Sequence, residues 1–528
     1  MTAERGRQLA WAAALLAVLA VAGTLAFHRL GVASFLGDES IYVEPARRVA
    51  AGDVYPMRQV SGRLYISKPP LSLLVEGASM RFLGTGEIGA RLPSAAAGTA
   101  VALLVFAAGA ALWDVATGLL AALLLAATPS WLMVHGVRQG TMDSELTLLV
   151  SVALFLYLRY RAGGRPAWLI GACLLSAAAA LVKSIFAPVE LLAVALAFEA
   201  AVAVLARRTG RGHREGNGKL GPPQWWAAVA LGASGAAALG AWFLDMSRRT
   251  ENFGAFLRKD TLVRATSGVD PGHLHGFTYY CTVLAEDYGL WLLGLLLIGK
   301  ALAPLWRGSA VQSRAALLLP LWAVVVVATL QTSASKLPWY PDTALPPLVL
   351  LLAAGITCTL RGLAPSNRPT KDGARGMRLL QAAAALAVVA GLGLHVHRAW
   401  GAVAAAAPRT EMHRLSIAFR QLPPRSVLYF DPPPTNLRAW NRIYLADMEP
   451  QVEGVPPPVP VANPAAADPG GRCVVLVTGN PETLRRPDLA AAPTLHLLSY
   501  GPQDAPLTLV DLCGGEALRR LAQVPVAQ

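Results

Sequence analysis

Charged residues are scarce in this sequence. Asp, Glu, Lys and Arg make up only 15% of its 528 residues, whereas hydrophobic residues make up 54%, and the mean hydropathy is +0.45. Ordinary soluble domains carry about 25% charged residues. Apolar runs of about twenty residues, the length that crosses a bilayer, recur along the chain. These observations exclude a water-soluble globular protein and indicate a polytopic helical membrane protein.

The motifs of nucleotide, thiol and serine-nucleophile chemistry are missing as well. The five cysteines form no Cys-X-X-Cys pair, and the sequence has no Gly-rich phosphate loop of the Walker type and no supported Ser-His-Asp arrangement. Nucleotide-driven chemistry is therefore not expected. Cys473 and Cys513 fall in the same C-terminal segment, and the sequence leaves open whether they are bridged.

Acidic residues are outnumbered by basic ones, which gives a net charge of +14. The basic residues concentrate in short segments between apolar runs, such as Arg207 to Arg214. Basic loops of membrane proteins face the cytoplasm, so we interpret the charge as topology and predict no nucleic-acid partner. Arg5 and Arg7 precede the first apolar run, which makes the N-terminus cytoplasmic.

The apolar runs predict about 11 transmembrane helices within a domain of residues 1–398, whose first outer loop is residues 31–91. The first run, about residues 9–30, is too long for a cleaved signal peptide. In residues 399–528, short strand-like runs at 426–430 and 473–477 alternate with Pro-rich turns. The predicted fold class is therefore an all-α polytopic membrane protein with a small C-terminal α/β domain on the extracytoplasmic side.

The first outer loop carries an unusual group of charges. Asp38 and Glu39 follow the first apolar run and open a short amphipathic helix to about Ala51. Lys68 stands before two prolines, which disfavour the α conformation for the preceding residue. Residues 71–83 have the spacing of a helix that lies at the membrane interface. The loop therefore predicts a charged site at a membrane surface.

The positive-inside rule does not explain one set of polar residues. Each of them follows an odd number of predicted membrane crossings, which places the whole set on the outer face. A transporter would place such groups at the bilayer midplane within its helices, whereas an enzyme that works at one interface would place them as found. They are Asp38, Glu39, Lys68, Arg138, Asp143, Lys183, Arg264 and Lys336.

This set of side chains suits one type of reaction. A partly desolvated carboxylate can take a proton from an acceptor hydroxyl. Lysine and arginine can hold a phosphate and stabilise the charge that grows on a leaving phosphate oxygen. Together they favour displacement at a sugar carbon that carries a lipid phosphate, whose isoprenoid tail stays in the bilayer.

A longer pattern contains these residues: Asp38-Glu39, Gly52-Asp53, Lys68-Pro69-Pro70-Leu71, Gly84, Glu87, Arg91-Leu92-Pro93-Ser94, Arg138, Asp143 and Lys336 to Pro341. It resembles the phospholipid-carrier-dependent glycosyltransferases of the GT-C class, a superfamily that holds the protein O-mannosyltransferases and the aminoarabinose transferases of lipid A. The resemblance ends near residue 350 and does not include the C-terminal domain.

The resemblance implies an inverting transfer of a hexosyl or pentosyl group from a polyprenyl-phosphate donor at the outer face of a bacterial cytoplasmic membrane. By position, Asp38 is the base, with Glu39 beside it and Asp143 as a second carboxylate. Lys68 matches the lysine that contacts the carrier phosphate. Further candidates for substrate or phosphate binding are Arg138, Arg264, Lys336 and Tyr340. The acceptor, whether lipid, glycan or protein, is not identified.

The sequence departs from the aminoarabinose branch at two positions. In that branch a glutamate before the lysine helps bind zinc, and an arginine follows the first acid by three residues. Here these positions hold Ser67 and Ile41. No metal or other cofactor is therefore predicted, and lipid A is not implied as the acceptor.

Simpler interpretations stay open for single residues. Asp38 and Asp143 could be acids of first helical turns, Lys68 and Lys183 could extend to lipid headgroups, and Tyr340 could be an interfacial aromatic. Two other functions also remain: a transporter or flippase of lipid-linked sugars, and a non-catalytic scaffold whose outer domain binds a partner.

Overall fold

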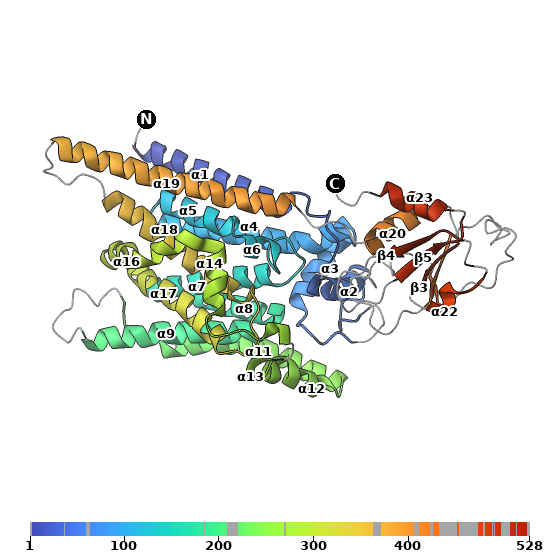
Figure 1. Cartoon of the computed structure of the whole chain (residues 1–528). Helices are drawn as coiled ribbons and strands as arrows, with labels where there is room; N and C mark the ends of the chain where they lie inside the picture. Colours follow the sequence, from blue (N-terminus) through green and yellow to red (C-terminus); the bar gives the residue numbers. More distant parts are fainter. Residues whose placement is uncertain are drawn as a thin grey trace. The chain divides into compact units, whose positions relative to one another are not determined.

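The computed structural model (Figure 1) describes residues 3–35, 37–59, 64–183, 185–208, 220–268, 271–362, 371–405, 411–422, 426–431, 451–453, 474–478, 481–487, 489, 492–497, 507–513 and 515–524. The chain forms two compact units. The membrane unit consists of residues 1–28 and 45–404, and the C-terminal unit of residues 29–44 and 405–528.

Most of the membrane unit is made of long apolar helices. Among the described residues, 9 helices are long and apolar enough to cross a membrane, or up to 10 with the bent pair Tyr279–Leu296 and Ile298–Arg307, whose parts meet at 57°. A shorter apolar helix, α5 (Val115–Ala126), adds one more segment. The spanning helices are α1 (Ala3–Phe27), α4 (Glu87–Leu112), α7 (Asp143–Gly163), α8 (Pro166–Lys183), α9 (Phe186–Arg208), α11 (Trp225–Arg249), α17 (Ala310–Gln331), α18 (Leu345–Gly362) and α19 (Lys371–Ala404).

These elements confirm the predicted polytopic helical class. If the bent pair is counted once, the nine spans, the bent pair and α5 correspond to the about 11 apolar segments that the sequence predicts as helices. The bent pair comprises α14 (Tyr279–Tyr288), η3 (Gly289–Leu292), α15 (Leu293–Leu296) and α16 (Ile298–Arg307), and the remaining short elements are α6 (Pro129–Met133), α12 (Phe253–Leu257), η1 (Arg258–Val263), α13 (Arg264–Thr266), η2 (Pro271–His273) and η4 (Tyr340–Ala344).

Two short helices of the first outer loop form as the sequence predicts. α2 spans Asp38–Ala50 and begins in the C-terminal unit, and α3 spans Leu71–Leu83. α3 starts directly after Pro70 and is followed by Gly84, whose φ of +92° favours glycine. A Cβ atom added at Gly77 would lie 2.5 Å from the Cβ of Val49, so a glycine is needed where the two helices meet.

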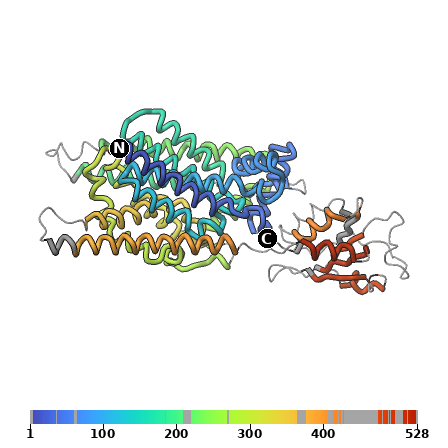
Figure 2. Tube along the Cα trace, turned by 90° about the horizontal axis from the view of Figure 1, so that it is seen from above, coloured from blue at the N-terminus to red at the C-terminus, as the bar shows by residue number. Residues whose placement is uncertain are grey.

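One end of the membrane unit is tied together by contacts between helix termini. Trp113 Nε1, after α4, donates a hydrogen bond to the carbonyl of Ala301 at 2.7 Å. Asp114 pairs with Arg361 at the end of α18. The N-terminus and α16 lie at this same end (Figure 1), whereas α1 approaches α19 near its other end (Figure 2), where the ring centroids of His28 and Trp400 are 4.7 Å apart. The Trp113-Asp114 connection, which the sequence assigns to the cytoplasm, therefore lies at the same end of the unit as the end of α18.

The C-terminal unit contains the predicted small α/β fold. Its five strands have the order β2-β1-β3-β5-β4, with β1 parallel to β2 and β3, and β5 antiparallel to β3 and β4. Leu476 and Val510 of the central strands are fully buried in the core. Cys513 is disulfide-bonded, and Cys473 lies outside the described residues. The elements are α20 (Glu411–Arg420), β1 (Val427–Asp431), β2 (Gln451–Glu453), β3 (Val474–Thr478), α22 (Pro481–Leu484), β4 (Thr494–Leu497), β5 (Leu507–Asp511) and α23 (Glu516–Gln523).

Candidate functional site

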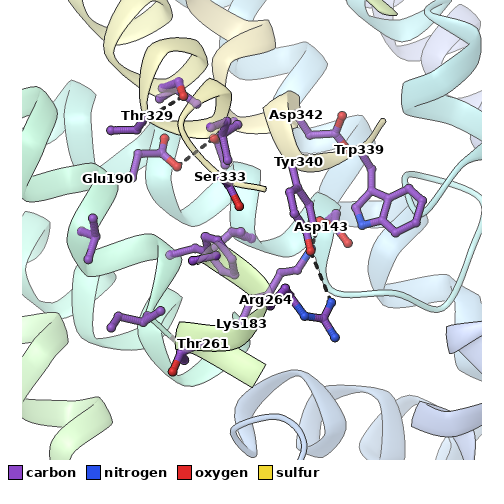
Figure 3. Close-up of a pocket in the computed structure, with 18 of the residues that line it drawn as sticks. Asp143, Lys183, Glu190, Thr261, Arg264, Thr329, Ser333, Trp339, Tyr340 and Asp342 are labelled. Atoms are coloured by element: carbon purple, nitrogen blue, oxygen red, sulfur yellow. Dashed lines mark hydrogen bonds and ion pairs between the residues drawn. The ribbon is translucent and has the colours of Figure 1, made fainter. Parts of the chain in front are cut away.

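The membrane unit contains a cavity of about 450 Å³ at helix ends opposite those joined by Trp113 and Asp114. Its walls come from the first turns of α7 and α9, the last turns of α8 and α17, η1, and η4. Figure 3 shows Asp143, Lys183, Arg264 and Tyr340 converging on the cavity. The charged and hydroxyl-bearing lining residues are Lys68, Asp143, Thr147, Lys183, Glu190, Asp260, Thr261, Arg264, Thr329, Thr332, Ser333, Tyr340, Asp342 and Thr343.

A buried ion pair lies on one side of this cavity. Lys183 Nζ pairs with Asp143 Oδ1, and the two residues are only 9% and 4% exposed. Asp143 is the first residue of α7 and Lys183 is the last of α8, so each charge also has the sign that its helix end favours. His135 Nδ1 lies 3.9 Å from the second oxygen of Asp143. These contacts fix the carboxylate in one orientation.

Aromatic rings connect the ion pair to the opposite wall. Lys183 Nζ lies 5.7 Å from the centroid of the Tyr340 ring, within the range of a cation–π contact. Arg264 donates a hydrogen bond of 3.5 Å to the Tyr340 hydroxyl. His135 stacks on Trp339 with 3.7 Å between ring centroids. Tyr340 therefore takes part in the site and is more than an interfacial anchor.

Lys68, Asp260 and Arg264 form a second charged group on the cavity wall. Asp260 Oδ2 lies 3.9 Å from Lys68 Nζ, and Asp260 Oδ1 lies 3.2 Å from an Arg264 terminal nitrogen. Asp260 and Arg264 are held by the α12–η1–α13 segment, which packs through Phe253 on Trp242. A backbone hydrogen bond of 2.8 Å from Ala334 N to Ala265 O joins this segment to the chain that follows α17.

The remaining wall of the cavity is apolar. Ile185, Phe186 and Val189 are 40%, 41% and 50% exposed although they lie at or beside the start of a membrane helix. Exposed apolar side chains on a membrane helix face lipid, because lipid tails are as apolar as the side chains themselves. The cavity thus combines a cationic end with an apolar wall that continues into the bilayer, which suits an amphiphilic anion. The apolar lining residues are Leu146, Ile185, Phe186, Val189, Leu262, Ala265, Val326 and Leu330.

Two acidic lining residues escaped the sequence analysis because they lie inside apolar runs. Thr343 donates a hydrogen bond of 2.8 Å to Glu190 Oε2. Glu190 Oε1 and Asp342 Oδ2 are buried and have no hydrogen-bond partner among the described residues. Buried polar atoms normally have partners, so these oxygens are available as acceptors for hydroxyl groups of a bound molecule. No sequence signal distinguishes them from acids that cap membrane helices.

Arg138 and Lys336 do not line the cavity. Arg138 donates hydrogen bonds of 2.7, 3.1 and 2.7 Å to the carbonyls of Leu25, Ala26 and His28 at the end of α1. Burial, with the neighbouring Arg91, lowers its pKa to about 10. Lys336 Nζ donates to the carbonyls of Ser333 and His275 at 2.6 and 3.2 Å. Both cations therefore hold helix ends and loops in place.

Arg138→Gln is expected to destabilise the protein by about 2–3 kcal/mol, because charge-assisted hydrogen bonds at the last carbonyls of α1 would be lost. The measurement is the melting temperature of the purified protein in detergent, with Arg81→Gln on the exposed face of α3 as the matched control. Equal melting temperatures for the two variants would contradict this structural role.

Asp38 and Glu39 belong to the C-terminal unit and are not among the residues that line the cavity. Asp38 is the first residue of α2 and accepts a hydrogen bond of 3.4 Å from the Tyr42 hydroxyl. Glu39 is only 1% exposed. Asp38 is therefore the more accessible of the two carboxylates.

Among the residues that the structure describes, no three His, Cys, Asp or Glu side chains are grouped as metal ligands. Ser67 and Ile41 replace the residues that the zinc-binding branch carries, so the residues present do not fit that metal site.

A family model and several solved structures are similar to this chain. Residues 67–210, less than half of the chain, match the family model described as dolichyl-phosphate-mannose-protein mannosyltransferase. The matched segment contains Lys68, Asp143 and Lys183 of the cavity wall. No curated protein matches the chain.

Solved structures match nearly the whole chain. ArnT from Cupriavidus metallidurans bound to undecaprenyl phosphate matches with a TM-score of 0.61 and 19% identity, over 95% of this chain and 98% of that one. Its apo state matches with a TM-score of 0.59 and 18% identity, over 98% and 99%. The oligosaccharyltransferase AglB from Archaeoglobus fulgidus, in complex with an inhibitory peptide and a dolichol-phosphate, matches with a TM-score of 0.52 and 12% identity, over 88% and 69%.

The family model and the fold together confirm the resemblance to the carrier-dependent glycosyltransferases of the GT-C class. At identities this low the structures establish the shared fold. The donor, the acceptor and the roles of single residues have to be argued from the site.

Proposed function

We propose that this chain, which has the fold of ArnT and of the archaeal oligosaccharyltransferase, is a membrane glycosyltransferase. It moves a sugar from a polyprenyl-phosphate carrier to a lipid, glycan or protein acceptor on the outer face of a bacterial cytoplasmic membrane. The observation that supports this most is the cavity, in which Lys68 and Arg264 lie with an apolar wall exposed to the bilayer.

A polyprenyl-phosphate sugar has the matching chemistry. Its phosphodiester is an anion for which lysine and arginine supply charge-assisted hydrogen bonds, and its isoprenoid tail remains in the lipid beside Ile185 and Phe186. In this proposal Tyr340, placed between Lys183 and Arg264, positions the phosphate end. Glu190 and Asp342 accept hydrogen bonds from sugar hydroxyls.

The proposed reaction is a single displacement at the anomeric carbon. Asp38, the base that the family resemblance implies by position, takes the proton of the acceptor hydroxyl. The acceptor oxygen forms a bond to that carbon while the bond to the phosphate oxygen breaks. The carrier phosphate leaves with the bonding electron pair, and the cations of the cavity stabilise its growing negative charge. Attack from the side opposite the phosphate inverts the anomeric configuration. Glu39 supports Asp38, and Asp143, oriented by Lys183, is the second carboxylate.

The sidedness follows from the charge distribution. The cavity lies at helix ends opposite those joined by Trp113 and Asp114. Positively charged segments stay in the cytoplasm, and Arg161 and Arg361 lie in the last turns of α7 and α18, at the ends away from the cavity. We therefore propose that the N-terminus is cytoplasmic, and that the cavity and the C-terminal domain are extracytoplasmic.

A transporter of lipid-linked sugars is the main alternative. Its substrate site would be expected near the bilayer midplane, at discontinuous helices. The charged lining residues instead include the first residue of α7 and the last residue of α8. This position at helix ends favours an enzyme that works at one interface.

Reconstitution distinguishes the two functions. Liposomes that contain the purified protein and a radiolabelled polyprenyl-phosphate sugar are expected to yield a glycoside and free polyprenyl phosphate in equal amounts. Mass spectrometry of surface lipids and proteins from cells with and without the gene would first identify sugar and acceptor. Movement of the labelled lipid across the bilayer without any glycoside would contradict the proposed function and support a transporter.

A further inference from the structure

Asp260 has a position that binding of an anion does not require. One of its carboxylate oxygens faces Lys68 Nζ and the other faces an Arg264 nitrogen, at 3.9 and 3.2 Å. A carboxylate at this point lies beside the two cations to which the carrier phosphate is assigned, and it repels any phosphate bound there. A neutral residue at this position would give the cavity a higher affinity for an anion.

Among the described residues, Asp260 is one of four carboxylates that line the cavity, with Asp143, Glu190 and Asp342. Asp143 is paired with Lys183, whereas Asp260 lies beside Lys68 and Arg264. A phosphate bound at these two cations therefore meets the negative charge of Asp260 as well.

Substrate and product of the proposed reaction differ in the charge of the phosphate. The donor is a phosphodiester and carries one negative charge, whereas the spent carrier is a phosphomonoester with a charge of about −1.5 to −2 at neutral pH. Without the Asp260 carboxylate beside them, Lys68 and Arg264 would therefore hold the product more tightly than the donor. Tight binding of the spent carrier would slow its release and inhibit the next turnover.

We infer that Asp260 is a specificity-determining residue that lowers the affinity of the cavity for the polyprenyl phosphomonoester relative to the phosphodiester, and so promotes release of the spent carrier. This inference rests on the proposed function. It assigns to Asp260 a role in discriminating the charge of the ligand, in addition to holding Lys68 and Arg264 in place.

The test uses the full-length protein in detergent and two sugar-free probes, undecaprenyl phosphate and its methyl ester. The first probe is a monoester and the second a diester with the same tail. Isothermal titration calorimetry gives the Kd of each for the wild-type protein, for Asp260→Asn and for Asp260→Glu. Glu251→Gln serves as a matched charge control, because Glu251 is exposed and does not line the cavity.

For Asp260→Asn the Kd of the monoester is expected to fall by roughly 25-fold and that of the diester by roughly fivefold, since one charge pair near contact distance in water contributes a factor of about five. The ratio of the two constants should thus shift about fivefold towards the monoester. Asp260→Glu, which keeps the charge, and Glu251→Gln should retain the wild-type ratio.

Equal changes for the two probes, or weaker binding of both, would show that Asp260 only positions the cations and would overturn the inference alone. If the wild-type protein bound neither probe, the proposed function would fail and this inference with it.

Discussion

Asp38→Asn is expected to reduce kcat for sugar transfer by about 10³-fold, the usual contribution of a general base, and to leave donor affinity close to that of the wild type. Asparagine keeps the size of the side chain and can still pair with the Tyr42 hydroxyl, which lies 3.4 Å from Asp38. It cannot accept the proton of the acceptor hydroxyl. The measurement is steady-state transfer from a labelled donor in liposomes.

A matched control is available in the same loop. Asp53 pairs with Arg48 at 2.7 Å, and both side chains are 35% exposed. Asp53→Asn therefore removes only a surface ion pair, which contributes about 0–1 kcal/mol, and should keep wild-type turnover. Near-normal transfer by Asp38→Asn, with the melting temperature unchanged, would remove Asp38 from the mechanism.

Lys68→Met is expected to raise the Kd of the polyprenyl-phosphate donor by about 10- to 100-fold, the loss of one hydrogen bond to a charged group. Methionine retains much of the apolar stem and leaves the following Pro69-Pro70 turn intact, so the fold should persist. Since a leaving phosphate gains negative charge, kcat should fall as well. Lys68→Arg should recover part of the affinity because it restores the charge.

Lys259→Met is the control for this variant. Lys259 lies on η1 beside Asp260 but is exposed and does not line the cavity. It should change donor binding by less than about twofold, as expected for a distant, screened surface charge. An unchanged donor Kd in Lys68→Met, or an equal loss in both variants, would argue that Lys68 extends to lipid headgroups instead.

Local chemistry made part of this site predictable. Two prolines fix the chain after Lys68 and precede α3, and the start of α7 places Asp143 at a helix end. Hydropathy identified the spans, and the alternation of basic and mixed-charge loops separated the two faces. Lys68, Asp143, Arg264 and Tyr340 all line the cavity, as a shared site requires.

The other features of the site depend on packing between segments that are distant in the sequence. The sequence predicts Lys183 only as a cation on the outer face, because its pairing with Asp143 follows from the contact between α7 and α8. Asp260 lies on a π-helical turn that no periodicity predicts. Glu190 and Asp342 are single acids inside apolar runs, and only the packed structure shows their position in the cavity.

Arg138 and Lys336 illustrate the opposite difficulty. Both are candidates for substrate or phosphate binding in the sequence because they are cations on the predicted outer face. In the structure each donates hydrogen bonds to main-chain carbonyls. The last carbonyls of a helix need hydrogen-bond donors. The sequence does not show which side chain supplies them until the neighbouring helix is placed.

The central claim is that a polyprenyl phosphate binds in the cavity of the membrane unit with its phosphate at Lys68 and Arg264. The most direct test is a cryo-electron microscopy structure of the purified protein with undecaprenyl phosphate. The account predicts phosphate density within hydrogen-bonding distance of both side chains, and the lipid tail along Ile185 and Phe186. Phosphate density elsewhere, with this cavity filled by protein side chains or opening towards the cytoplasm, would contradict it.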